Sequence, residues 1–229
     1  MKLIQVTDRI WYFPLDDTKD RPILGYIRGD HFSVAVDAGH SAEHVREFYA
    51  AIEAEGLPLP ALTVITHWHW DHTFGMHAVN GLTLANRRTN AHLRQLLEEH
   101  GDDLLGFITP LDPFTGVEYA NGQEVKVVLS DLEYKKRHKI RAGGVDVEIM
   151  QAPSPHTDDS TLVLIPGERC LFFGDSVLGH FPDGFVDEEQ MDELITMVEE
   201  LDFDYALTGH WELRTKEQVL ADMQERIFD

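Results

Sequence analysis

The sequence has a single cysteine, few basic residues and no long apolar run. Cys170 is the only cysteine among 229 residues, so no internal disulfide can form. It opens the apolar run at 170–173, and we interpret it as a buried structural thiol rather than a reactive one. No apolar stretch approaches the roughly 18 residues of a membrane span. The first residues lack the apolar core of a signal peptide, so we expect a cytoplasmic protein with no membrane partner.

The shortage of basic residues limits the partners of the chain. Lys and Arg total 19 against 41 Asp and Glu, which gives a formal net charge of −22. Such a surface repels phosphate backbones and anionic lipid, so we expect a small-molecule substrate and no nucleic acid. A local basic patch is compatible with this composition. The length and the lack of a linker predict one domain over residues 1–229, and nothing in the sequence indicates an oligomeric state.

The first third of the chain alternates strand and helix patterns. Short apolar runs predict strands at 3–6, 10–13, 23–27, 32–36 and 62–66. Ser41 is a typical N-cap residue, and a stripe of apolar residues at helical spacing follows it. The stripe consists of Val45, Phe48, Tyr49 and Ile52. We therefore predict a helix between the fourth and fifth strands.

The rest of the chain repeats this alternation. Residues 102–122 are rich in proline and glycine, and we expect them to be irregular, whereas 124–150 is predicted to contain strands. Asp187 is expected to cap a helix. Thr215 and Gln218 form a capping box for a last helix. The apolar face of that helix carries Val219, Leu220, Met223 and Ile227. Strands in each half with helices to cover them predict an α+β fold of two sheets packed face to face.

The residues that indicate chemistry are concentrated directly after the strand 62–66. His67, His69, Asp71 and His72 lie within six residues. Imidazole nitrogens and carboxylate oxygens are good ligands for zinc and other divalent metals. In an extended chain alternate residues point the same way, so His67 and His69 can reach one ion while the other two face a second. A surface histidine cluster is the alternative, but crowding four such groups after a buried strand is costly without a metal.

The pattern His67-x-His69-x-Asp71-His72 resembles the signature of the metallo-β-lactamase superfamily. Three later segments, within 20–215, are similar to its remaining ligand motifs, and they supply His156, Asp175 and His210. The resemblance implies a four-layer αββα sandwich with the metal ligands on loops at one edge of the sheets. Taken alone, each late residue is equally compatible with a structural role.

The resemblance also implies a role for each ligand. It assigns His67, His69 and His156 to a first ion, Asp71, His72 and His210 to a second, and Asp175 to both. Paired ions ~3.5–4 Å apart share a hydroxide nucleophile, because metal binding lowers the pKa of water to about 7. Asp71 is the expected catalytic residue, which orients this hydroxide or receives a proton. Two zinc ions fit the nitrogen-rich set, and iron or manganese are alternatives.

Several residues around this cluster are expected to shape the site. Asp37 matches the early aspartate of the superfamily, and it either orients a ligand imidazole or caps a turn. Trp68 and Trp70 are expected to pack away from the first ion. The turn-rich segment 179–185 is a candidate pocket wall. The acidic turn at 16–20 is expected to be a solvated loop, and the alternative is that it overhangs the same edge.

The resemblance does not select one substrate, because the superfamily acts on many ester-type bonds. We expect a thioester or a lactone, since the chain lacks the basic surface of RNA-processing members and the signal peptide of exported β-lactamases. One alternative is a mononuclear iron persulfide dioxygenase, and another is a non-catalytic metal-binding module. The complete ligand set argues against both, because neither needs all of it.

Overall fold

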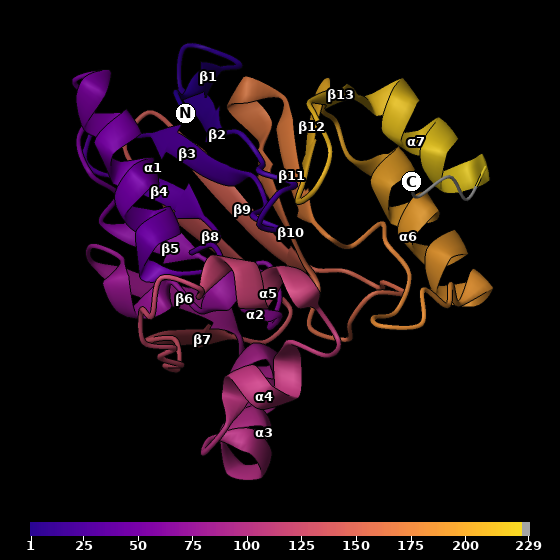
Figure 1. Ribbon diagram of the computed structural model, residues 1–229. Coiled ribbons are helices and arrows are strands. Elements are labelled where there is room, and N and C mark those ends of the chain that lie inside the picture. The colour runs from indigo at the N-terminus through magenta and orange to yellow at the C-terminus, as the bar shows by residue number, and fades with distance from the viewer. Residues whose placement is uncertain (226–229) are drawn as a thin grey trace.

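Two β-sheets packed face to face form the centre of the molecule (Figure 1). The computed structural model describes residues 1–225. The first sheet contains, in spatial order, β1 (Ile4–Gln5), β2 (Ile10–Phe13), β3 (Leu24–Arg28), β4 (Ser33–Val36), β5 (Leu62–Val64), β6 (Leu82–Asn86) and β7 (Leu132–Tyr134). The second contains, in spatial order, β13 (Arg214–Thr215), β12 (Tyr205–Thr208), β11 (Cys170–Gly174), β10 (Thr161–Ile165), β9 (Asp146–Gln151) and β8 (Arg137–Arg141).

The strand directions determine which loops share an edge of the sandwich. In the first sheet β4, β5, β6 and β7 run parallel to one another, so their carboxyl ends lie at the same edge. In the second sheet β11 and β12 are also parallel, whereas β8 to β11 alternate in direction. The loops after β5, β11 and β12 can therefore approach one another from the two sheets.

Helices cover both outer faces, as Figure 1 shows. Helix α1 (Ala42–Ala54) packs on the first sheet, and α6 (Glu188–Glu200) and α7 (Lys216–Glu225) pack on the second. The predicted α+β class and four-layer αββα sandwich are confirmed. The Oγ of Ser41 accepts the backbone N–H of His44 at 3.2 Å, as expected for an N-cap. The backbone N–H of Thr215 donates to the Oε1 of Gln218 at 2.9 Å, in agreement with the predicted capping box.

The prediction of an irregular segment at 102–122 was wrong. This segment contains α4 (Leu104–Ile108), which contacts α3 (Arg87–His100), and α5 (Pro113–Glu118), which contacts α4. An aspartate caps each short helix: Asp103 accepts the N–H of Gly106, and Asp112 accepts the N–H of Phe114. Pro113 occupies the first helical turn, where the missing N–H costs nothing. Residues 124–131 lie outside any strand, so the strand region begins later than predicted.

Apolar side chains from both sheets form the central core. Val34 and Ile27 of the first sheet belong to the same buried cluster as Phe172 and Cys170 of the second. Burial raises the pKa of the Cys170 thiol, which agrees with the predicted structural role. Val219 and Met223 are buried on α7, while Ile227 lies outside the described residues. Within residues 1–225, no helix has the length and apolar character needed to cross a bilayer.

A buried ion pair, which no local sequence pattern indicates, joins the loop before β3 to α5. Arg21 is 1% exposed, and its Nε and Nη2 each donate to a carboxylate oxygen of Glu118 at 2.8 Å. Ser41 also donates to Glu118, and Glu47 accepts from the Nη1 of Arg21 at 3.1 Å. This network fixes the loop at 14–22 against the start of α1. A buried pair is costly to break, because the remaining charge has no partner.

We predict that Arg21→Ala lowers the free energy of unfolding by about 3–5 kcal/mol, the usual effect of removing one partner of a buried ion pair. Urea unfolding followed by circular dichroism measures the change. Arg94→Ala is the matched control, because Arg94 pairs with Glu133 at 3.4 Å on the surface and should contribute less than about 1 kcal/mol. Equal effects of the two substitutions would contradict the proposed importance of the buried network.

Candidate metal centre

The ends of four strands bring all seven predicted ligands to one edge of the sandwich. The loop after β5 carries His67 and His69 and leads into α2 (Trp70–Thr73), which contains Asp71 and His72. His156 lies in the loop between β9 and β10, Asp175 follows β11 directly, and His210 follows β12. Residues distant in sequence thus meet because the two sheets place these strand ends together.

Three imidazoles form a first group. The Nδ1 of His69 lies 3.1 Å from the Nε2 of His67 and 3.0 Å from the Nε2 of His156. All three side chains are buried, and these nitrogens lie within 4.8 Å of one another. Burial lowers the pKa of each of the three imidazoles. They are therefore neutral near pH 7, which is the protonation state in which histidine binds a metal.

Two carboxylates and two imidazoles form a second group. The Oδ2 of Asp71 lies 3.0 Å from the Nε2 of His72 and 3.1 Å from the Nε2 of His210. Burial disfavours protonation of both imidazoles, but the nearby carboxylates of Asp71 and Asp175 outweigh it and raise the pKa of each well above its ordinary value. The two buried carboxylates thus need positive charge beside them. A divalent cation would supply the same compensation.

The carboxylate of Asp175 lies between the two groups. Its Oδ2 is 4.0 Å from the Nε2 of His67 and 3.8 Å from that of His156. Toward the second group, Asp175 approaches His72 at 3.4 Å and His210 at 3.3 Å. A Cβ at Gly209 would lie only 2.0 Å from the Oδ1 of Asp175. Only glycine therefore fits where the backbone approaches this carboxylate.

The ligand atoms fit the demands of metal ions. Among residues 1–225, the Nε2 of His72 and the Oδ1 of Asp175 are buried and have no hydrogen-bond partner of good geometry, although they lie 3.4 Å apart as an ion pair. A buried polar atom without a partner is costly, and a bound cation removes that cost. Five imidazoles and two carboxylates also suit divalent transition metals.

Asp37 orients one imidazole of each group. Its Oδ2 accepts the Nδ1–H of His72 at 2.8 Å, which leaves the Nε2 of His72 to face the centre. The same oxygen accepts the hydroxyl of Thr66 at 2.8 Å, and the Thr66 oxygen lies 3.2 Å from the Nδ1 of His67. Asp37 also accepts the backbone N–H of Thr66 at 2.7 Å. Both expectations for Asp37, orientation of a ligand and capping of a turn, therefore agree with its contacts.

The segment 179–185 contributes to the first group. The backbone oxygen of Gly179 accepts the Nδ1–H of His156 at 2.7 Å. The ring of Phe181 lies 5.7 Å from that of His69 and 5.2 Å from that of Trp70. Trp70 is buried and donates its Nε1–H to Asp112 at 2.8 Å, as expected for a packing residue. The segment predicted as a pocket wall does lie beside the site.

Sequence reasoning underestimated the acidic turn at 16–20. We expected a solvated loop, but an Oδ1 of Asp20 lies 3.5 Å from the Nδ1 of His210. Burial and the nearby Asp71 raise the pKa of Asp20 to about 7. The neighbouring Arg21 network holds the turn in this position. An arginine followed by proline after an acidic turn was the only signal, and it is too weak to identify such a contact.

Two cavities open onto the site from different sides. A cavity of about 350 Å³ is lined by His69, His156 and Trp68. Trp68 therefore contacts a pocket in addition to packing on His92, at 5.4 Å between ring centres. A second cavity of about 550 Å³ reaches His210 and is lined by Trp211. The substrate can thus extend from the site in two directions.

A third group of potential ligands lies apart from these residues. His92, Asp158 and Asp159 also approach within 4.8 Å. The guanidinium of Arg88 lies 3.3 Å from Asp158, and Thr89 donates to Asp159 at 2.7 Å. A cation is thus already present beside this group, and we do not assign a metal to it.

The comparison with known families agrees with this geometry. Residues 25–210 match the metallo-β-lactamase superfamily, and this segment contains all seven of the clustered residues. The chain belongs to the metallo-β-lactamase superfamily. Its candidate ligand groups are those of a metal-binding protein.

Individual superfamily members are only distantly similar. The chain is 23% identical to an atrochrysone carboxyl ACP thioesterase of Aspergillus fumigatus over 192 residues, which are 84% of this chain and 49% of the relative. The chain therefore spans about half the length of this curated relative. Among solved structures, a metallo-β-lactamase from Pontibacter korlensis has a TM-score of 0.65 at 16% identity. The match covers 97% of this chain and 98% of the lactamase chain. A stereoselective inverting sec-alkylsulfatase from Pseudomonas sp. has a TM-score of 0.70 at 15% identity. The match covers 98% of this chain and 41% of the sulfatase chain. These structures show the shared fold.

We predict that Asp37→Asn weakens metal binding about 10–100-fold, because groups that orient ligand histidines typically contribute that much. Competition with a chromogenic chelator measures the affinity. Asp131→Asn is a matched control: Asp131 accepts from the N–H and hydroxyl of Thr83 as Asp37 does from Thr66, but no predicted ligand depends on it. Unchanged affinity in Asp37→Asn, or equal weakening in both variants, would show that Asp37 does not act on the metal ligands.

Proposed function

We propose that the chain hydrolyses an ester-type bond of a small molecule, a thioester or a lactone, at a pair of divalent metal ions. The position of Asp175 carries this proposal. One carboxylate lies within 4.0 Å of imidazole nitrogens from both ligand groups, as a residue that contacts two ions must. A mononuclear enzyme would have no use for the second group.

The chain's residues would share the ions as the superfamily resemblance implies. We assign His67, His69 and His156 to one ion, Asp71, His72 and His210 to the other, and Asp175 to both. We propose zinc, because five of these side chains are imidazoles. Bound ions would provide a hydroxide nucleophile at neutral pH and compensate the negative charge that develops on the substrate oxygen.

Asp71 is the proposed catalytic residue of this chain. It is 5% exposed, and its Oδ2 faces the Nε2 atoms of His72 and His210. The attraction of these two imidazoles outweighs burial and holds the pKa of Asp71 well below its ordinary value, so it is a carboxylate. A fixed carboxylate at this position orients the attacking group and accepts its proton.

The choice of an ester-type substrate rests on the relative. The Aspergillus fumigatus protein is described as an ACP thioesterase, and 84% of this chain aligns with it. The β-lactamases among the solved structures share the fold at 14–17% identity, which does not favour a β-lactam as substrate. We therefore place thioesters and lactones before β-lactams and phosphodiesters.

We predict that Asp71→Ala lowers kcat by about 100-fold or more on whichever ester the parent cleaves, because it removes a ligand and a proton acceptor together. The measurement is steady-state kinetics on thioester, lactone, phosphodiester and β-lactam substrates, with elemental analysis of each protein. Asp102→Asn is the control and should leave kcat unchanged, because Asp102 is exposed in the turn after α3.

Two results would overturn the proposal. Equal turnover by the parent and Asp71→Ala on every ester would remove the assigned role of Asp71. One iron per chain with consumption of oxygen would instead identify a mononuclear dioxygenase.

A further inference from the structure

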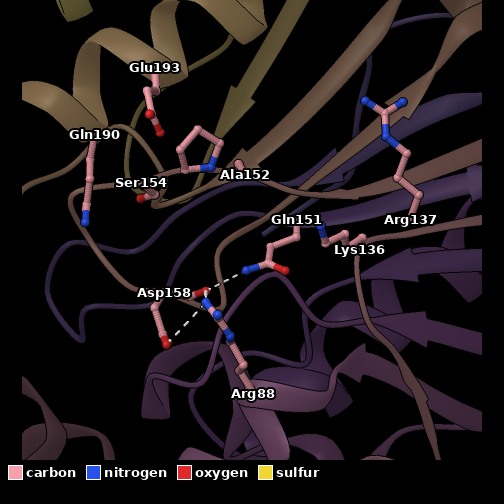
Figure 2. Close-up of a pocket in the computed structure, with 10 residues that line it drawn as sticks. Arg88, Lys136, Arg137, Gln151, Ala152, Ser154, Asp158, Gln190 and Glu193 are labelled. Atoms are coloured by element: carbon pink, nitrogen blue, oxygen red, sulfur yellow. Dashed lines mark hydrogen bonds and ion pairs between the residues drawn. The ribbon is translucent and has the colours of Figure 1, made fainter.

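A basic cavity lies beside the candidate metal centre of this acidic protein. It has a volume of about 620 Å³, and Arg88, Lys136 and Arg137 line it (Figure 2). Arg88 lies in the first turn of α3, Arg137 is the first residue of β8, and Lys136 directly precedes that strand. The formal net charge of the chain is −22, so three basic side chains around one cavity are not expected from its composition. Such a local concentration requires an explanation.

The basic cavity adjoins the cavity that holds the metal-ligand candidates. Ser154, Asp158 and Gln190 line both. The Oγ of Ser154 accepts the backbone N–H of His156 at 3.1 Å, so the shared wall is also the support of a predicted ligand. A molecule at the metal centre can therefore extend into the basic cavity.

The cations differ in how far their charge is already compensated. The Nη1 of Arg88 donates to the backbone oxygen of Asp158 at 2.7 Å and lies 3.3 Å from its carboxylate. Lys136 and Arg137 are exposed, and within residues 1–225 neither has a carboxylate within 4.0 Å. Glu193, an acidic lining residue on α6, lies on the opposite side of the cavity from Arg137 in Figure 2. Positive charge is thus available on the β8 side.

The other opening of the site has a different character. The cavity of about 550 Å³ beside His210 is lined by apolar side chains, among them Leu15, Ile23 and Trp211, and also by the carboxylates of Asp17 and Glu212. Its one cation, Arg214, lies over the ring of Trp211 at 5.6 Å and 3.7 Å from Asp222. The two carboxylates disfavour an anionic group in this opening, whereas the cations of the basic cavity favour one.

We propose that the basic cavity binds a phosphate group on the leaving-group side of the substrate ester. Guanidinium and ammonium groups are the usual protein partners of phosphate. The proposal rests on the proposed function, because it takes the metal centre as the place where the ester is cleaved. It predicts a substrate with an apolar acyl end and a phosphorylated alcohol or thiol end.

Two thioesters that differ only by a phosphate test the proposal. They are the pantetheine and 4′-phosphopantetheine thioesters of the same acyl group, measured with the metal-loaded full chain. The test variant is Lys136→Ala/Arg137→Ala. The control, Lys139→Ala/Arg141→Ala, removes the same number of charges from the same basic segment at 135–141, but neither residue lines the basic cavity.

We expect the parent to favour the phosphorylated thioester about tenfold in kcat/KM, through a lower KM, as charged hydrogen bonds to phosphate would give. The test variant should lose this preference, while its kcat/KM for the pantetheine thioester is unchanged. The control variant should keep the preference for the phosphorylated thioester. Added salt should weaken the preference. Equal kcat/KM for both thioesters in the parent, or a preference kept in the test variant, would overturn the proposal.

A binding measurement separates the basic cavity from the hydrolytic activity. Calorimetric titration with 4′-phosphopantetheine and with pantetheine requires no turnover. If the parent cleaves neither thioester, the proposed thioester activity fails, and the titration alone decides the role of the basic cavity. About tenfold tighter binding of the phosphorylated compound, lost in the test variant, would support it. Equal binding of the two compounds would overturn it.

Discussion

The burial of charge around Asp175 is the constraint on which the rest of the structure depends. Asp71 and Asp175 are 5% and 4% exposed, and imidazoles surround both. Buried carboxylates are tolerated only where positive charge or hydrogen-bond donors compensate them. Here the compensation comes from His72 and His210 and, in our proposal, from metal ions. The close passage of Gly209 and the orienting contacts of Asp37 serve the same arrangement.

The sandwich makes this arrangement possible because it brings strand ends from both sheets to one edge. Each ligand lies at or shortly after a strand, so the packing between the sheets controls the distances between the groups. The Arg21–Glu118 pair fixes the neighbouring turn, which places Asp20 beside His210. Stability and site geometry are thus linked through the same loops. Cavities reach the site beside His156 and beside His210, and a basic cavity adjoins the first of them.

The fold was predictable from the sequence because strand and helix patterns are local, and the structure brings the seven candidate ligands together. The spacing of His67, His69, Asp71 and His72 after an apolar run is visible in the sequence alone. Contacts between distant segments were not predictable: nothing local indicates that Arg21 pairs with Glu118, or that Asp20 reaches His210. Proline and glycine at 102–122 suggested an irregular segment, whereas Asp103 and Asp112 cap short helices there. The basic residues at 135–141 lie close together in the sequence, but their position beside the site depends on the tertiary fold.

Anomalous diffraction from crystals of the zinc-loaded protein tests the central claim most directly. We predict two anomalous peaks per chain on either side of the carboxylate of Asp175. One peak should have His67, His69 and His156 as neighbours, and the other Asp71, His72 and His210. The peaks should lie ~3.5–4 Å apart, the separation at which two ions act on one substrate. A single peak, or peaks away from Asp175, would contradict the binuclear centre.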